Sequence, residues 1–98
     1  MKTSTFQKRT KGISKASNGY KFALELLTSK DTVYTCHTSG RGRFTTNIDR
    51  TEETVCVLTM AGLKERIDFV KGNNSPRGGK TGNYISLTSK GKRKKIEL

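Results

Sequence analysis

Apolar and polar residues alternate in the first half of the chain and predict a strand there. The apolar side chains occupy every second position: Tyr20, Phe22, Leu24 and Leu26. This spacing is typical of a strand with one buried face. The Asn-Gly pair at 18–19 favours a hairpin turn before it, because both residues tolerate positive φ. Ala, Leu and Glu within the run are good helix formers, so a helix over 20–28 is the alternative, but we expect a strand.

Four other runs are rich in β-branched or aromatic residues, a composition that favours strands. They cover residues 32–38, 44–48, 54–60 and 83–88. The run at 54–60 is the most apolar, and its valines suit a buried strand. Within 83–88, the side chains of Tyr84, Ser86 and Thr88 are expected on one face of the strand.

The segment over 61–70 is compatible with two structures. Leu63, Ile67 and Val70 have the spacing of one helix face. Alternate positions also fit a strand, with Glu65 as the exception. The Ala-Gly pair that begins the segment suits a type II turn, since Gly supplies the positive φ that this turn needs. We expect a hairpin across this turn and keep the helix as the alternative.

Together these elements predict a mainly β protein, with α+β as the alternative. A chain of 98 residues makes one domain, for which we expect a small antiparallel sheet or partly open barrel of about five to seven strands. An oligonucleotide-binding barrel is one architecture with this pattern. Residues 13–98 are expected to form the domain and 1–12 a basic, partly ordered arm, so that the basic ends are flexible. Residues 72–82 are a loop by composition, and the alternation of Ile96 and Leu98 is compatible with a last strand.

The charge of the chain is strongly positive and is concentrated at its two ends. Lys and Arg number 20 against 8 Asp and Glu, which gives a formal net charge of +12. Residues 1–18 carry five basic groups and no acid, and residues 71–95 carry eight and no acid. A field of one sign usually has an anionic partner. The basic groups are interleaved with Ser, Thr, Asn and Gly, whose polar groups are of the kinds that contact phosphate and sugar.

Basic residues and two aromatic residues form the predicted nucleic-acid site. Glycine-rich loops over 40–43 and 76–82 allow a ligand to approach the backbone closely. Phe44 and Tyr84 lie near basic residues, and aromatic rings near cations serve as stacking platforms for bases. Packing within the protein is the alternative role for both rings. The predicted binding residues are Lys8, Arg9, Lys11, Arg41, Arg43, Phe44, Arg77, Lys80, Tyr84, Lys90, Lys92, Arg93, Lys94 and Lys95.

Other chemistry fits the sequence poorly. The Gly-Lys-Thr at 79–81 lacks the earlier glycine of a phosphate-binding P-loop, because Asn74 stands at that position. Cys36, His37 and Cys56 lack zinc-ligand spacing, and adjacent strand residues point to opposite faces. The chain has one His, and its acids do not form the paired set that a hydrolase needs. We therefore expect reduced, buried cysteines, no metal, no cofactor and no enzymatic activity.

The function that follows is non-catalytic binding of the phosphate backbone of single-stranded DNA or RNA, with little sequence preference because no base-reading helix is recognisable. Two alternatives stay open: a ribosome- or virion-associated assembly protein with basic arms, and a basic inhibitor or adaptor that binds an acidic protein surface. No apolar run approaches the roughly 20 residues of a membrane-spanning helix, and the start lacks the apolar core of a signal peptide. We expect a cytoplasmic protein with no membrane partner, and association with nucleoid, ribosome or virion is compatible with the sequence. A homodimer or larger assembly is compatible with the sequence.

Overall fold

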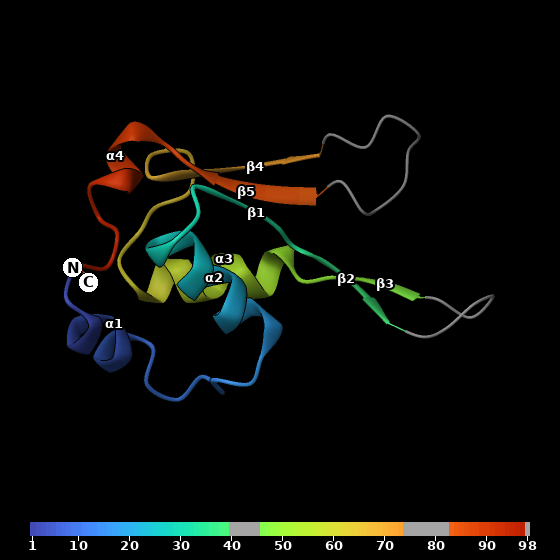
Figure 1. Cartoon of the computed structure of the whole chain (residues 1–98), viewed down its shortest axis with the longest axis horizontal. Coiled ribbons are helices and arrows are strands. Elements are labelled where there is room, and N and C mark those ends of the chain that lie inside the picture. Colours follow the sequence, from blue (N-terminus) through green and yellow to red (C-terminus); the bar gives the residue numbers. More distant parts are fainter. Residues whose placement is uncertain (40–45, 74–82, 98) are drawn as a thin grey trace.

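Two helices, α2 and α3, pack beside each other and cover one face of a three-stranded sheet in the computed structural model of the chain (Figure 1). The structure describes residues 1–39, 46–73 and 83–97. Its elements are α1 (Thr3–Arg9), α2 (Asn18–Thr28), β1 (Thr32–Tyr34), β2 (Cys36–Ser39), β3 (Thr46–Asp49), α3 (Thr51–Met60), β4 (Phe69–Asn73), β5 (Asn83–Leu87) and α4 (Ser89–Lys92). The two termini, α1 and α4 lie at one end of the molecule, and β2 to β5 extend toward the other end (Figure 1).

The sheet has the strand order β1-β5-β4, and both pairings are antiparallel. The register places Tyr34 of β1 and Gly72 of β4 on either side of Tyr84 in β5. β2 and β3 form a separate antiparallel pair. The described residues thus contain a small open sheet and a two-stranded pair together with four helices. The predicted mainly β fold, with a sheet or partly open barrel of about five to seven strands, is therefore wrong.

Two of the predicted strands are confirmed in outline. β1 and β2 together span 32–39, with a break at Thr35, and β5 spans 83–87. β3 begins at 46 and overlaps the end of the run predicted over 44–48. These stretches are short and rich in β-branched residues, so local preference and the fold agree.

The run over 20–28 is a helix, so the predicted strand and its hairpin turn are wrong. The hydroxyl of Ser17 accepts a hydrogen bond from the backbone N–H of Tyr20 at 3.2 Å and caps the start of α2. Asn18 and Gly19 therefore lie in the first helical turn. The residues of α2 that are buried follow the period of a helix: Gly19, Tyr20, Ala23, Leu26 and Leu27.

The apolar run over 54–60 is also a helix, so the predicted buried strand is wrong there. Glu52 and Glu53 lie in the first turn of α3, where negative charge is favourable. The buried residues have helical spacing: Thr51, Thr54, Val57 and Leu58. The hydroxyl of Thr54 donates to the carbonyl of Arg50 at 2.8 Å, which satisfies a buried polar group inside the helix.

Gly62 ends α3 and replaces the predicted hairpin turn. Its φ is +101°, so glycine does supply a positive φ, but as a helix cap. Leu63 N donates to the carbonyl of Leu58 and Gly62 N to that of Thr59, both at 3.0 Å, the pattern of a Schellman motif. Residues 63–68 then form a turn that leads into β4, so the predicted second strand of the hairpin is wrong.

Both ends of the chain are folded against the core, so the predicted flexible ends are wrong. Phe6 of α1 is fully buried, and its ring centroid lies 5.5 Å from that of Tyr20. The segment 1–12 thus contains a helix that contributes to the core. The amino group of Met1 donates to the carbonyl of Lys95 at 2.7 Å, which joins the two ends.

The C-terminal tail forms α4 and then returns to the core. Ile96 is buried, and its N–H donates to the carbonyl of Leu27 at 2.8 Å. Glu97 makes an isolated parallel bridge with Lys2. Leu98, which the sequence placed in a last strand, lies outside the described residues.

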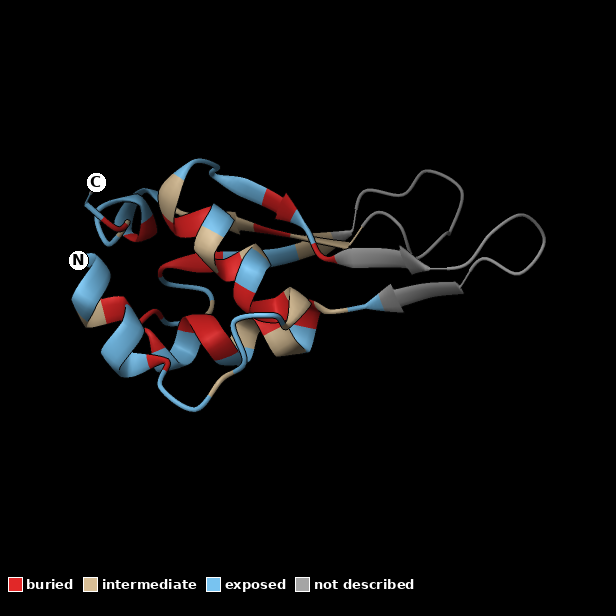
Figure 2. Cartoon of the chain, turned by 60° about the horizontal axis from the view of Figure 1, so that its bottom comes forward, coloured by how far each residue is buried: buried red, intermediate tan, exposed pale blue. Residues whose placement is uncertain are grey.

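The core lies between the helices and the inner face of the sheet (Figure 2). That inner face carries four buried side chains: Val33, Phe69, Ile85 and Leu87. The helices therefore cover one face of the sheet, and the opposite face is turned away from the core.

Candidate nucleic-acid interface

The sheet face turned away from the helices is the first part of the candidate site, and we call it the outer sheet face. By the strand register it is made of Thr32, Tyr34, Val70, Gly72, Tyr84 and Ser86. Tyr34 is 52% exposed and Val70 40% exposed. An uncovered sheet face with aromatic side chains can offer a planar surface to unpaired bases.

Tyr34 and Tyr84 form an aromatic pair on this face. Their ring centroids lie 6.1 Å apart, and the ring planes are tilted by 59°, an arrangement that the charge distribution of aromatic rings favours. The ring of Tyr84 lies over Gly72, where a Cβ atom would overlap the Cζ and Oη atoms of that ring. Glycine at 72 therefore leaves the space beside β4 that the Tyr84 ring occupies.

Hydroxyl groups lie next to the tyrosine pair. The Oγ atoms of Thr32 and Ser86 are 2.7 Å apart, on the next cross-strand pair of the outer sheet face. Ser86 Oγ also lies 3.4 Å from the carbonyl of Asp31. Hydroxyl groups beside aromatic rings can contact the sugar and phosphate of a stacked nucleotide.

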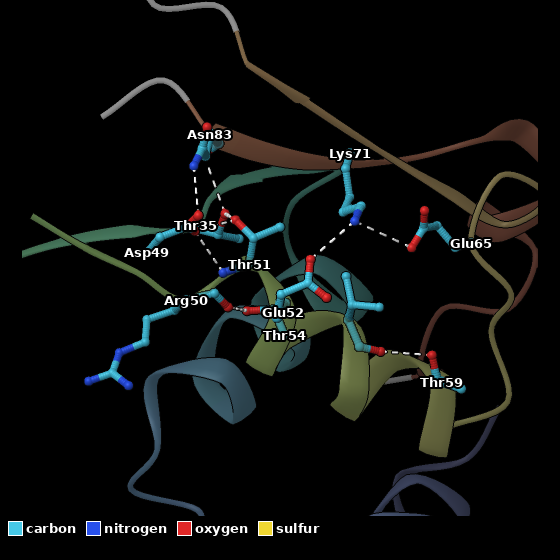
Figure 3. Close-up of polar contacts among 11 residues, drawn as sticks. Thr35, Asp49, Arg50, Thr51, Glu52, Thr54, Thr59, Glu65, Lys71 and Asn83 are labelled. Carbon is cyan, nitrogen blue, oxygen red and sulfur yellow. Dashed lines mark hydrogen bonds and ion pairs between the residues drawn. The ribbon is translucent and has the colours of Figure 1, made fainter. Parts of the chain in front are cut away.

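A polar junction fixes the ends of β1 and β5 beside the tyrosines (Figure 3). The Oγ1 atoms of Thr35 and Thr51 lie 2.6 Å apart, and Thr51 N donates to Asp49 Oδ1 at 2.9 Å. Asn83 Nδ2 donates to Asp49 Oδ2 at 2.8 Å, and Thr35 N donates to the carbonyl of Asn83 at 2.9 Å. Thr35 and Thr51 are buried, so their hydroxyl groups would lose free energy in any arrangement that broke these hydrogen bonds. The network therefore holds the strand ends in one arrangement.

Lys71 lies on the helix side of the sheet, where its side chain contacts two glutamates (Figure 3). Its Nζ atom lies 3.2 Å from Glu52 Oε1 and 3.7 Å from Glu65 Oε1. The hydrogen bond to Glu52 raises the pKa of Lys71, burial opposes this, and Glu65 adds to the increase. This first cation of the basic 71–95 stretch therefore joins β4 to α3 and the 63–68 turn.

Eight of the predicted binding residues lie at the end of the molecule that carries α1, α4 and the termini (Figure 1). They are Lys8, Arg9, Lys11, Lys90, Lys92, Arg93, Lys94 and Lys95. The structure thus brings together the two basic segments from opposite ends of the sequence.

Three of the tail lysines form ion pairs. Lys95 and Lys92 lie 2.9 and 3.9 Å from the carboxylate of Asp31, and Lys94 lies 2.9 Å from that of Asp68. The hydrogen bond from Lys95 is the main cause of a lowered pKa of Asp31. The tail is therefore partly neutralised and does not act as a free polycation.

Other cations at this end have no acidic partner among the described residues. They are Lys8, Lys11, Lys90 and Arg93. Arg9 has a structural contact, because its Nη1 atom donates to the carbonyl of Ala61 at 2.9 Å, at the C-terminal end of α3.

Five predicted binding residues lie outside the described residues: Arg41, Arg43, Phe44, Arg77 and Lys80. Tyr84 is the stacking candidate that the structure does describe. The sequence did not single out Tyr34 or Gly72. Alternation alone places Thr32 and Tyr34 on one face of β1, but no local signal shows that β1 pairs with β5.

Residues 1–39, 46–73 and 83–97 contain neither a metal-binding cluster nor a membrane-spanning helix. No group of three or more His, Cys, Asp and Glu side chains in that part of the chain is arranged to hold a metal ion. No helix there has the length and apolar character required to cross a bilayer. Cys56 is a free, exposed cysteine, so the expectation that it is buried is wrong.

Comparison with known proteins does not assign the chain to a class. No protein-family model, no curated protein and no solved structure matches it.

Proposed function

We propose that this protein binds single-stranded DNA or RNA across the outer sheet face, without catalysis and with little sequence preference. The observation that carries the proposal is the Tyr34–Tyr84 pair, in which Tyr34 is exposed and Tyr84 half-buried. The pair lies on a sheet face that none of the described helices covers, in a chain of net charge +12. Stacking platforms combined with positive charge are how many proteins bind single strands.

Each part of the surface has a role in this proposal. Unpaired bases stack on Tyr34 and Tyr84, and the hydroxyls of Thr32 and Ser86 contact sugar or phosphate. The basic end of the molecule attracts the phosphate backbone. Sequence preference is weak, because α2 and α3 pack against each other and the sheet instead of entering a groove. The protein would act in the cytoplasm, where nucleoid, ribosome or virion nucleic acid is its partner.

A salt titration tests the proposal. A single-stranded oligonucleotide is expected to bind at low salt. If about four phosphates are contacted, its affinity should fall roughly 50-fold between about 50 and 200 mM monovalent salt. Fluorescence anisotropy with labelled DNA and RNA strands measures this. A duplex of the same sequence is the control and should bind more weakly, because its bases are already stacked on each other. No binding at low salt, or an affinity that does not change with salt, would contradict the proposal.

Gly72→Ala tests whether the position of the Tyr84 ring matters. The new Cβ atom would overlap the ring, so the flexible side chain of Tyr84 must swing away from β4. We expect about a threefold to tenfold loss of affinity, since one stacked base contributes about 1–3 kcal/mol. The melting temperature should change by only about 2 °C, because the displaced ring lies outside the core.

The matched control is the same substitution in a Tyr84→Val background. There Gly72→Ala should have no further effect on affinity, because the ring that it displaces is absent. An equal loss in both backgrounds would mean that Gly72 acts through the backbone and not through Tyr84.

A further inference from the structure

A hollow of about 400 Å³ lies at the end of the outer sheet face that is nearer α4. It is open to solvent and lined by Arg66, Ile67, Thr88, Ser89 and Lys90. One wall is the turn that leads into β4, and the other is the segment between β5 and α4. By strand alternation Thr88 continues the row formed by Tyr84 and Ser86, so the hollow begins about 14 Å along β5 from Tyr84.

The two walls of the hollow are held together by backbone contacts. Thr88 N donates to the carbonyl of Asp68 at 2.9 Å, and Thr88 Oγ1 donates to the carbonyl of Ile67 at 2.6 Å. Gly91 is packed so closely against Asp68 that a Cβ atom there would overlap the Asp68 carbonyl oxygen. The spacing of the walls is therefore set before any ligand arrives.

Asp68 holds the turn that forms the first wall. Its carboxylate is 1% exposed and accepts hydrogen bonds from Lys64 N at 2.8 Å and Lys94 Nζ at 2.9 Å. The negative charge of Asp68 is thus already paired with Lys94. Glu65, the next acid in the turn, is paired with Lys71.

The polar groups that line the hollow favour an anion. Arg66 and Lys90 make no ion pair, and Ser89 Oγ makes no hydrogen bond, with any part of the chain that the structure describes. Arg66 has a φ of +71°, a conformation that costs a residue other than glycine about 1 kcal/mol. Two unpaired cations and a hydroxyl in one preformed hollow match the donors that bind a phosphate group.

We propose that this hollow binds a phosphate group of the nucleic-acid strand whose bases stack on Tyr34 and Tyr84. This inference rests on the proposed function. Arg66 and Lys90 supply the charge, and Ser89 donates a hydrogen bond to a phosphate oxygen. The strand then runs along β5, with its bases at the tyrosines and this phosphate in the hollow.

The test compares the oligonucleotide affinity of a variant that lacks two charges at the hollow with that of a variant that lacks two charges elsewhere. The double variant Arg66→Gln/Lys90→Gln is compared with Lys15→Gln/Lys21→Gln. Lys15 precedes α2 and Lys21 lies within it, and both also lack an acidic partner among the described residues. Both variants lose the same net charge. We expect the first to weaken oligonucleotide binding by about 20-fold and the second by about twofold, because only the first loses direct contacts to phosphate. Equal losses in the two variants would overturn the inference while leaving the proposed function intact.

Titration with inorganic phosphate, followed by ¹⁵N–¹H NMR, tests the hollow without a nucleic acid. The amide signals of Arg66, Ser89 and Lys90 should shift saturably in the wild type and in Lys15→Gln/Lys21→Gln, but not in Arg66→Gln/Lys90→Gln. Absent or non-saturating shifts would overturn the phosphate site. Saturable shifts in a protein that binds no oligonucleotide would overturn the strand as the source of the phosphate, and the proposed function with it.

Discussion

Replacing Tyr34 and Tyr84 together with valine is expected to weaken binding of a single-stranded oligonucleotide by about 100-fold. Each ring is proposed to stack on one base, and a stacked base contributes about 1–3 kcal/mol. Valine keeps the strand preference of both positions. The loss of one cross-strand aromatic pair should lower the free energy of unfolding by only about 1 kcal/mol. Anisotropy titrations measure the affinity, and thermal unfolding measures the stability.

The control for this prediction keeps the rings. Tyr34→Phe/Tyr84→Phe removes both hydroxyls but leaves the stacking surfaces, so its affinity should stay within about threefold of the wild type. A similar loss in the valine and phenylalanine variants would show that hydroxyl contacts, not stacking, provide the affinity. Wild-type affinity in the valine variant would exclude the outer sheet face as the binding surface.

Replacing Asp68 with alanine is expected to lower the free energy of unfolding by about 2–3 kcal/mol. The carboxylate is almost fully buried and accepts hydrogen bonds from Lys64 N and Lys94 Nζ. Its removal leaves the part-buried N–H of Lys64 without this acceptor and breaks the contact between the turn and the tail. Urea unfolding measures the change. Lys94→Gln is the matched control and should cost less than Asp68→Ala, because the glutamine amide can still donate a hydrogen bond to the carboxylate and Lys64 N keeps its acceptor.

The buried carboxylate of Asp68 is also expected to make the stability of the protein depend on pH. Burial alone would raise the pKa of Asp68, but hydrogen bonds from Lys94 and from Lys64 N outweigh it, and the pKa lies below its ordinary value of 3.8. A lowered pKa in the folded state stabilises the protein fully at pH values above the ordinary pKa, and this contribution is lost as the pH falls through the folded-state pKa. The stability difference between wild type and Asp68→Asn should therefore be largest near neutral pH and shrink below about pH 3.8. A difference that does not change with pH would show that charge at Asp68 contributes nothing.

The sequence identified parts of the candidate site whose signals are local. The run at 83–88 predicted a strand with Tyr84 and Ser86 on one face, and the structure places both residues on the outer sheet face. The concentration of basic residues at the two ends of the chain is visible in the sequence alone. Tyr34 lay in a predicted strand, but nothing near it in the sequence indicated its neighbour.

The secondary-structure predictions were wrong where the same residues fitted both the two-residue period of a strand and the 3.6-residue period of a helix, or where local composition favoured a strand. The apolar positions in 20–28 alternate, yet Tyr20, Ala23 and Leu27 also have helical spacing. Ser17 favours the helix because its side chain caps the N-terminus. The Asn-Gly pair indicated a hairpin turn and was given more weight in the prediction. In 54–60 the valines favoured a strand locally, but packing against α2 stabilises a helix, because tertiary burial outweighs the small differences in intrinsic preference.

The sequence by itself therefore determined the net charge, the strands at 32–38 and 83–88 and the face on which Tyr84 lies, because composition and alternation depend only on neighbouring residues. The tertiary structure decided the two central helices, the pairing of β1 with β5 and the ion pairs that neutralise part of the tail. It also placed Tyr34 beside Tyr84 and Arg66 beside Lys90. Each of these depends on which distant segment buries a given face, and that free energy is gained only when the partner surfaces meet.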